Sequence, residues 1–185
     1  MSTSLSQKIQ ESIGLPPLHK IDPSNQDTNT TLISSDITRL GQSCIPVCLI
    51  ALYKLSKTPE GSECILRGDN STNWVNILLG DKKTEIIQRI AVYANYQNAL
   101  IEEKLNEICS KAVHYTQHEL NADKKLEQIS DRMLVERNNI LQYLPPELKI
   151  GELIDDSTLD DKTNKMEGPI STLMHKIESG FSTPH

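Results

Sequence analysis

The segment from Pro46 to Lys57 is apolar around nearly its whole circumference when it is wound as a helix. Its apolar side chains are Val47, Leu49, Ile50, Leu52 and Leu55. A helix without a polar face is stable only when other helices surround it, so this segment is predicted to be the core helix of a bundle. The apolar run is far too short to span a bilayer, and no membrane span is predicted.

The segments that follow repeat apolar residues at spacings of three and four, the period of an amphipathic helix. Residues 98–120 are typical, with Ile101, Leu105, Ile108, Ala112 and Val113. No segment alternates convincingly with the period of two that a half-buried strand would show. The chain is therefore predicted to be all-α, a compact helical bundle of about seven or eight helices with short connections and a flexible N-terminal tail.

Proline and capping residues set the predicted helix boundaries. Pro46 is predicted to open a fresh helix after a break near residues 42–45, because proline suits a first helical turn. Thr58 is predicted to cap a helix that begins at Pro59. Asn73 or Thr72 caps a short helix that ends at Gly80, and Ser34 or Ser35 caps the helix before the break.

Three regions are predicted along the chain. Residues 1–31 form a flexible N-terminal tail or a weak helix, residues 32–180 a single all-α domain, and residues 181–185 a frayed C-terminus. The stretch 138–169 combines two prolines, two Asp pairs and a Gly-Pro break, and a last short helix follows it. Residues 141–169 are predicted to be the contact surface, because irregular segments carry specificity more often than helix backs.

Charge and composition exclude several functions. The 185 residues include 19 Lys and Arg and 25 Asp and Glu, which gives a net charge of −6. Such a surface repels phosphate backbones, so nucleic-acid binding is not predicted. The N-terminal residues lack a basic region followed by an apolar core, so no secretion signal is predicted. We therefore expect a cytoplasmic protein with four reduced cysteines.

Two passages resemble a known family. The first comprises Ile45-Pro46, Leu52-Tyr53-Lys54, Thr58-Pro59-Glu60-Gly61 and residues 74–80, and the second is the helix and Leu-Pro end of residues 133–153. Together they resemble the YidB-like bacterial family known as domain of unknown function 937, over about residues 40–153. The resemblance implies an all-α bundle in a bacterial cytosol and supplies no catalytic residues.

His114 and His118 are the first candidate metal ligands. They are spaced at i and i+4, so both project from one face of a helix, and that spacing can bind a divalent metal. Tyr115 stands where a zinc protease would carry its glutamate. Two solvated histidines on a polar face are the preferred interpretation.

Asp155, Asp156, Asp160 and Asp161 form the densest acidic cluster. These carboxylates are candidates for contact with a basic partner, or for Mg²⁺ or Ca²⁺ binding if they fold inward. A solvated loop with Asp residues at helix N-termini is the preferred interpretation.

The cysteines and the loop at residues 69–73 give weaker patterns. Cys44 and Cys48 have a spacing that zinc sites use, but a second pair is missing and Cys48 lies in an apolar helix, so buried inert thiols are predicted. The loop from Asp69 to Asn73 resembles the start of a calcium loop. Trp74 and Gly80 stand where that loop requires Gly and Glu, so a capped turn is predicted instead.

The predicted function is that of a non-catalytic cytosolic protein that acts through protein contacts. The expected partner is an unidentified protein, and a basic partner would complement the acidic chain. The apolar helix stripes are also compatible with a homo-oligomer. No cofactor is predicted, because no nucleophile elbow, P-loop or dinucleotide fingerprint occurs. The alternatives are a metal-dependent enzyme or metal-binding protein that uses the histidine pair or the Asp cluster, and a small-ligand carrier with a pocket between residues 46–57 and Trp74.

Overall fold

The computed structural model describes residues 4–21, 35–69, 71–119 and 126–153, and within these ranges all regular structure is helical. This confirms the predicted all-α class. The α-helices are α1 (Leu5–Ile13), α3 (Asp36–Ser56), α4 (Pro59–Arg67), α5 (Trp74–Leu79), α6 (Lys83–Ala94), α7 (Asn98–Glu119), α8 (Leu126–Ile140) and α9 (Ile150–Leu153). Short 3₁₀ turns are η1 (Gly80–Lys82), η2 (Leu141–Tyr143) and η3 (Pro146–Leu148).

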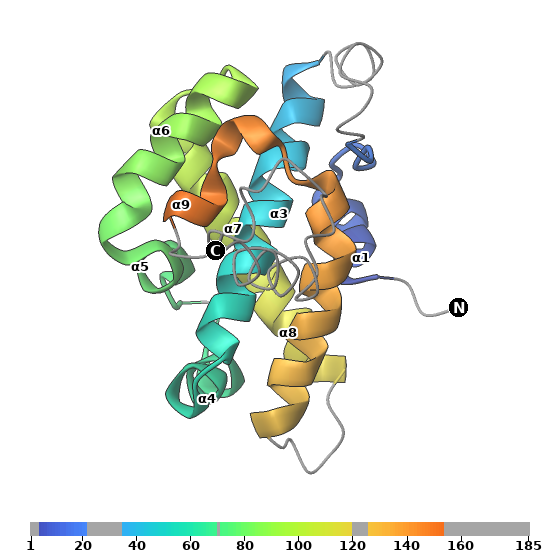
Figure 1. Ribbon diagram of the computed structural model, residues 1–185, viewed down its shortest axis with the longest axis vertical. Coiled ribbons are helices and arrows are strands. Elements are labelled where there is room, and N and C mark those ends of the chain that lie inside the picture. Colours follow the sequence, from blue (N-terminus) through green and yellow to red (C-terminus); the bar gives the residue numbers. More distant parts are fainter. Residues whose placement is uncertain (1–3, 22–34, 70, 120–125, 154–185) are drawn as a thin grey trace, which may run out of the picture.

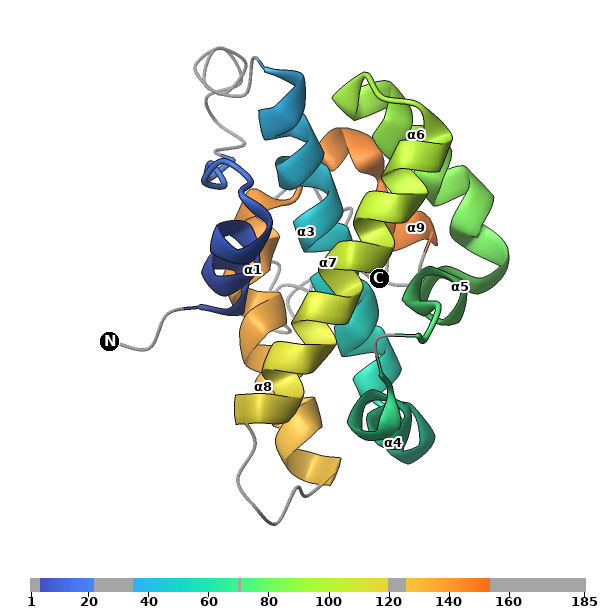
Figure 2. The same cartoon turned by 180° about the vertical axis from the view of Figure 1, so that it is seen from behind.

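Helix α3 runs through the middle of the molecule, as predicted for its apolar sequence. It contacts α1, α4, α5, α6, α7 and α8 (Figure 1). Its residues from Leu40 to Leu52 are all buried. Seen from behind, α7 crosses α3 with α1 on one side and α6 on the other (Figure 2). The core therefore forms where α6, α7 and α8 close around α3.

The predicted helix break at residues 42–45 is wrong. α3 is continuous from Asp36 to Ser56, and Pro46 lies inside it. A proline within a helix costs about 3 kcal/mol because it removes one backbone hydrogen bond. The helix tolerates that cost because it is buried on both sides of Pro46, from Leu40 to Leu52. Tertiary packing therefore outweighs the local preference of proline.

The capping residues of the next helices are where the sequence predicts them. The Thr58 hydroxyl accepts a hydrogen bond from the Gly61 amide at 3.1 Å, and Pro59 is the first residue of α4. The Asn73 side chain accepts from the Asn76 amide at 3.1 Å and begins α5. Each cap satisfies a backbone N–H that has no partner within its helix.

The N-terminal residues 5–13 form a helix that belongs to the packed body. Leu5 and Ile9 of α1 are fully buried in the core, and α1 contacts α3, α7 and α8. Ser4 and Gln7 form a capping box at its start, and Gly14 ends it with a φ of 73°. The sequence left two predictions open for this stretch, a flexible tail or a weak helix. The structure shows a helix at residues 5–13. Residues 22–34 of the N-terminal region lie outside the described residues.

The stretch after α8 is a series of short turns. η2 and η3 precede α9, and Lys149 breaks the helical path between η3 and α9 with a φ of 45°. The buried Gln42 side chain bonds to the main chain of His19 on one side and to the Tyr143 carbonyl on the other. Gln42 thereby fixes this end of the chain to α3. The frayed C-terminus and last helix that the sequence predicts lie outside the described residues, which end at 153.

A search of the described residues for membrane spans finds no helix that combines the length and the apolar character needed to cross a bilayer.

Candidate functional site

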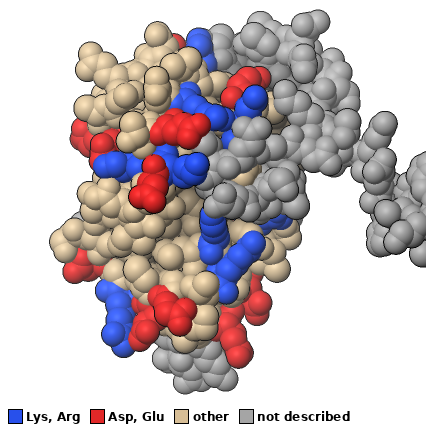
Figure 3. All heavy atoms as spheres, turned by 60° about the vertical axis from the view of Figure 1, so that its left-hand side comes forward, with Lys and Arg blue, Asp and Glu red and all other residues tan. Residues whose placement is uncertain are grey.

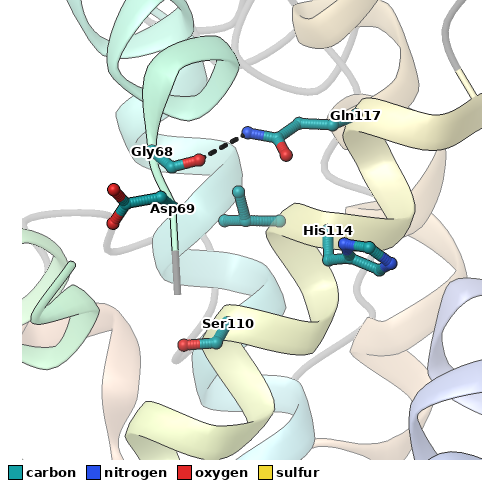
Figure 4. A pocket seen from close by; sticks show the side chains of 6 residues that line it. Gly68, Asp69, Ser110, His114 and Gln117 are labelled. Atoms are coloured by element: carbon teal, nitrogen blue, oxygen red, sulfur yellow. Dashed lines mark hydrogen bonds between the residues drawn. The ribbon is translucent and has the colours of Figure 1, made fainter. Parts of the chain in front are cut away.

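A small polar hollow lies between the end of α4 and the outer face of α7 (Figure 4). Its volume is about 190 Å³. The residues that line it are Gly68, Asp69, Ser110, Val113, His114 and Gln117. We call it the α4–α7 hollow. It contains His114, one of the residues that the sequence singles out.

Gln117 closes the inner side of this hollow. Its side-chain amide donates to the carbonyl oxygens of Ile65 at 2.7 Å, Leu66 at 3.2 Å and Gly68 at 2.9 Å (Figure 4). The last carbonyls of a helix have no partner within the helix, so a side chain that satisfies them fixes the position of the helix end. Gln117 therefore holds the C-terminal end of α4 against α7.

Asp69 lies at the outer edge of the hollow, in the predicted capped turn. One of its carboxylate oxygens accepts from the Ser71 hydroxyl at 2.6 Å, the Ser71 amide at 2.9 Å and the Thr72 hydroxyl at 3.1 Å. These hydrogen bonds, with those from Ser71 first, lower the pKa of Asp69 because they favour its charged form. The hollow therefore has a negative charge at its edge at neutral pH.

His114 and His118 lie side by side on the exposed face of α7. Their ring centroids are 4.2 Å apart and the rings meet edge to face at 64°. Only His114 reaches the α4–α7 hollow. Within the described part of the chain, no group of three or more His, Cys, Asp or Glu side chains is arranged to hold a metal ion. His114 thus lines the same hollow as Asp69, and its ring lies against that of His118.

Trp74 packs against Gly68, which lines the hollow, but does not line the hollow itself. The indole is fully buried, and a Cβ atom added at Gly68 would overlap its Cζ2 and Cη2 atoms. Gly68 is therefore required for the indole to fit. The indole Nε1 is buried without a hydrogen-bond partner. The pocket predicted between residues 46–57 and Trp74 remains a prediction, and Trp74 packs in the same core cluster as α3.

A second and larger hollow lies between α6 and η3, with a volume of about 390 Å³. The residues that line it are Glu85, Gln88, Arg89, Val92, Tyr93 and Glu147. We call it the α6–η3 hollow. Val92 is 78% exposed, the most exposed of the large apolar side chains among the described residues. On the side of the molecule that carries α5 and α6, acidic and basic side chains lie next to each other among the coloured atoms (Figure 3).

Arg89 positions the two walls of the α6–η3 hollow. Its guanidinium donates to the Leu148 carbonyl at 3.2 Å and pairs with Glu85 at 2.9 Å. On the α6 wall, burial raises the pKa of Tyr93 to about 12. The nearby Glu147 carboxylate also raises this pKa, and Arg39 lowers it. The Tyr93 hydroxyl is therefore protonated at physiological pH and can donate a hydrogen bond.

The other predicted site residues are either buried or outside the described residues. Cys44, Cys48 and Cys109 are buried free thiols, and burial raises the pKa of Cys44 to about 12. Asp155, Asp156, Asp160 and Asp161 lie outside the described residues, as does the predicted contact surface beyond residue 153.

Sequence reasoning missed two polar residues that organise the fold. Gln117 is not distinguished by any local pattern. Glu136 is, because it falls in the buried stripe of α8 between Met133 and Ile140, where an apolar residue is the norm. A charged residue in that register indicates an internal ion pair.

Comparison of the chain with protein-family models, curated proteins and solved structures gave no match.

Proposed function

We propose that this protein is a non-catalytic contact protein whose partner binds at the α6–η3 hollow. The observation that carries the proposal is the exposure of Val92 beside the half-buried Tyr93 ring in a concave surface. Tyrosine and arginine in a depression are common anchors of protein interfaces, and Tyr93 and Arg89 line this one, with Val92 adding exposed apolar area. The hollow also uses Glu147, which belongs to the stretch 141–169 that the sequence predicts to be the contact surface.

The charges around the hollow favour a basic partner. Glu85 is already paired with Arg89, whereas the exposed Glu147 stands on the opposite wall. In the sequence, the Asp cluster begins eight residues after Glu147. A partner segment with an apolar anchor flanked by Lys or Arg complements this surface.

The wider assignment follows the same proposal. In this proposal the protein is a YidB-like helical bundle of about seven or eight helices in the bacterial cytosol. It binds proteins and does not bind nucleic acid. In this proposal a second copy of the chain can also bind at the same apolar surface, which would give a homo-oligomer.

Affinity capture with matched variants tests the proposal. The tagged chain and its Val92→Asp, Glu147→Lys and Val135→Asp variants are used to capture proteins from a lysate of the source cells. Val135 is 51% exposed on α8, so it offers the same substitution at another exposed site. We expect Val92→Asp and Glu147→Lys to reduce the captured partner by about tenfold, which corresponds to about 1.4 kcal/mol. Capture that is equal for Val92→Asp and the unmodified chain contradicts the proposal.

The paired imidazoles of His114 and His118 favour a second candidate, divalent metal binding on α7. The observation is the separation of 4.2 Å between their ring centroids, on one exposed helix face. Native mass spectrometry after incubation with Zn²⁺ or Ni²⁺ tests it. A stoichiometric metal increment that is lost in His114→Ala supports this candidate. An increment lost only in Asp160→Ala assigns the metal to the Asp cluster, and an unchanged mass excludes both sites at the metal concentration used.

A further inference from the structure

The C-terminal end of α3 carries basic side chains around a tyrosine, where α3 packs against α8 (Figure 1). The Lys57 ammonium lies 4.7 Å from the centroid of the Tyr53 ring, and the Arg137 guanidinium of α8 lies 5.3 Å from it. Both distances are within the range in which an aromatic ring attracts a cation. The Tyr53 ring therefore holds positive charges from two helices beside one another.

The surface around this ring is partly apolar and accessible. Leu134 is 42% exposed and precedes Arg137 by three residues on α8, so the two side chains are neighbours on one helix face. Lys54 follows Tyr53 in α3, and the side chains of Lys54 and Lys57 are exposed. We call Tyr53, Lys54, Lys57, Leu134 and Arg137 the Tyr53 patch. Its basic and apolar side chains complement an acidic segment that contains an apolar residue.

The charges of the patch favour an acidic occupant. Lys57 forms no ion pair with another described residue. The exposed acidic residues that flank the patch in the sequence are Glu60, at the start of α4, and Asp131, one turn before Leu134. Three basic residues of the patch outnumber these two. The patch is therefore a positive surface on a chain whose net charge is −6.

The two hollows do not suit an acidic segment. The α4–α7 hollow has the Asp69 carboxylate at its edge, and the α6–η3 hollow is lined by Glu85 and Glu147. Carboxylates of an incoming segment are repelled at both places. Of these three surfaces, the Tyr53 patch is the one whose charge fits an acidic segment.

The chain itself supplies such a segment directly after the described residues. From Ile150 to Asp161 the sequence has five acidic residues and no basic one, and residues 159–161 read Leu-Asp-Asp. Ile150 is buried in the core, so the start of α9 is fixed in the body. The eight residues from 154 to 161 span about 26–29 Å when extended. The described part of the chain, about 130 residues, corresponds to a radius of gyration of about 14 Å, so the segment is long enough to reach the patch.

We propose that the Tyr53 patch binds residues 159–161 of the same chain. The leucine of this segment packs against Leu134, and its two carboxylates pair with Lys57 and Arg137. Exposed ion pairs are individually weak, but a short connector raises the local concentration of the segment to the millimolar range, so weak contacts suffice to hold it. This surface is separate from the α6–η3 hollow and does not depend on the partner proposed there. An acidic segment of another protein binds the patch only by displacing residues 159–161.

Carbodiimide crosslinking of the full chain tests this contact, because the reagent joins an ammonium to a carboxylate that touches it. An equal mixture of ¹⁵N-labelled and unlabelled chain is crosslinked at micromolar concentration and digested, and the linked peptides are identified by mass spectrometry. Links from Lys57 to Asp160 or Asp161 are compared with links from Lys111, an exposed lysine of α7.

We expect Lys57 to be linked to Asp160 or Asp161 within one isotopic form, and Lys111 to give only background. The yield is expected to fall in 1 M NaCl, because the Debye length shortens from about 10 Å at 0.1 M salt to about 3 Å. A missing Lys57 link, or an equal yield for Lys111, overturns the proposal. Links that join labelled to unlabelled peptides assign the patch to a second copy of the chain and overturn binding within one chain.

Two adjacent substitutions on α8 separate the patch from the surrounding surface. Leu134→Asp adds a negative charge inside the patch, and Val135→Asp makes the same change at a side chain that is 51% exposed on another face of the helix. We expect Leu134→Asp to lower the yield of the Lys57 link by at least about fivefold, and Val135→Asp to leave it within about twofold. Equal yields in the two variants overturn the proposal. If Leu134→Asp loses helical circular dichroism, Arg137→Gln takes its place, and an unchanged yield in that variant overturns the proposal equally.

Discussion

Replacement of Gly61 by alanine tests the packing of α4 against α3, because helix propensity and packing predict opposite signs. Gly61 lies in the first turn of α4, within a helix. By helix propensity alone, Gly→Ala stabilises a helix by about 0.5–1 kcal/mol. The structure predicts a loss instead, because a Cβ atom at this position overlaps the backbone carbonyl of Leu55 in α3.

The magnitude follows from what must move. A backbone carbonyl cannot rotate away, so the turn between α3 and α4 has to shift, at a cost of about 1–3 kcal/mol for overpacking. The shift also weakens the Thr58 cap, which accepts from the Gly61 amide and is worth about 1 kcal/mol. After the propensity gain is subtracted, a net destabilisation of about 1–3 kcal/mol remains.

Urea unfolding followed by circular dichroism measures this difference. Gly41→Ala is the matched control, because its added Cβ atom meets Leu15 Cβ at an ordinary 3.6 Å within a helix. The control is expected to be neutral or to gain up to about 1 kcal/mol. If Gly61→Ala unfolds at the same or a higher urea concentration than the unmodified chain, the packing of the α3–α4 turn described here is wrong.

Three further predictions concern the sites. Gln117→Ala removes the bonds to the carbonyls of Ile65, Leu66 and Gly68 and is expected to lower the unfolding free energy by about 1–3 kcal/mol. The exposed Gln88→Ala is the control in the same urea assay, and equal stability of the two variants contradicts this role. Alkylation of the native chain at pH 8, followed by peptide mass mapping, is expected to label the partly exposed Cys64 first. Cys44 is expected to be spared, because its pKa of about 12 keeps the thiol protonated. Early labelling of Cys44 would refute its burial. Ultraviolet titration is expected to show almost no ionisation of Tyr93 at pH 10, and Glu147→Gln should lower the pKa of Tyr93. A tyrosinate signal at pH 10 that is larger in the unmodified chain than in Tyr93→Phe contradicts this.

Local sequence rules located most helix ends because capping is a local interaction. Thr58 and Asn73 each bond to an amide three residues ahead, so the capped turn is complete within a few residues. The effect of Pro46 on its helix is not local. Its effect depends on the burial of α3 from both sides, which is decided by helices far away in the sequence, and the predicted break was therefore wrong.

The candidate sites show the same division. His114 and His118 were identifiable as a pair because their spacing alone places them on one helix face. The α4–α7 hollow was not predictable, because it requires Gln117 to reach Gly68 across 49 residues. The helical period places Val92 outside the buried stripe of α6, which is formed by Ile86, Ile90 and Ala94. A single exposed apolar residue is common on protein surfaces, so the hollow beside Val92 became visible only once the fold placed Glu147 opposite it.

Site-specific photo-crosslinking in the source cells tests the contact surface most directly. A photoreactive phenylalanine analogue is placed at position 92 on α6 or, as control, at position 135 on α8. The account predicts a discrete adduct with a second protein chain at position 92, lost when Glu147→Lys is added, and no such adduct at position 135. Adducts that are absent at position 92, or equal at the two positions, would show that the α6–η3 hollow is not the surface through which this protein acts.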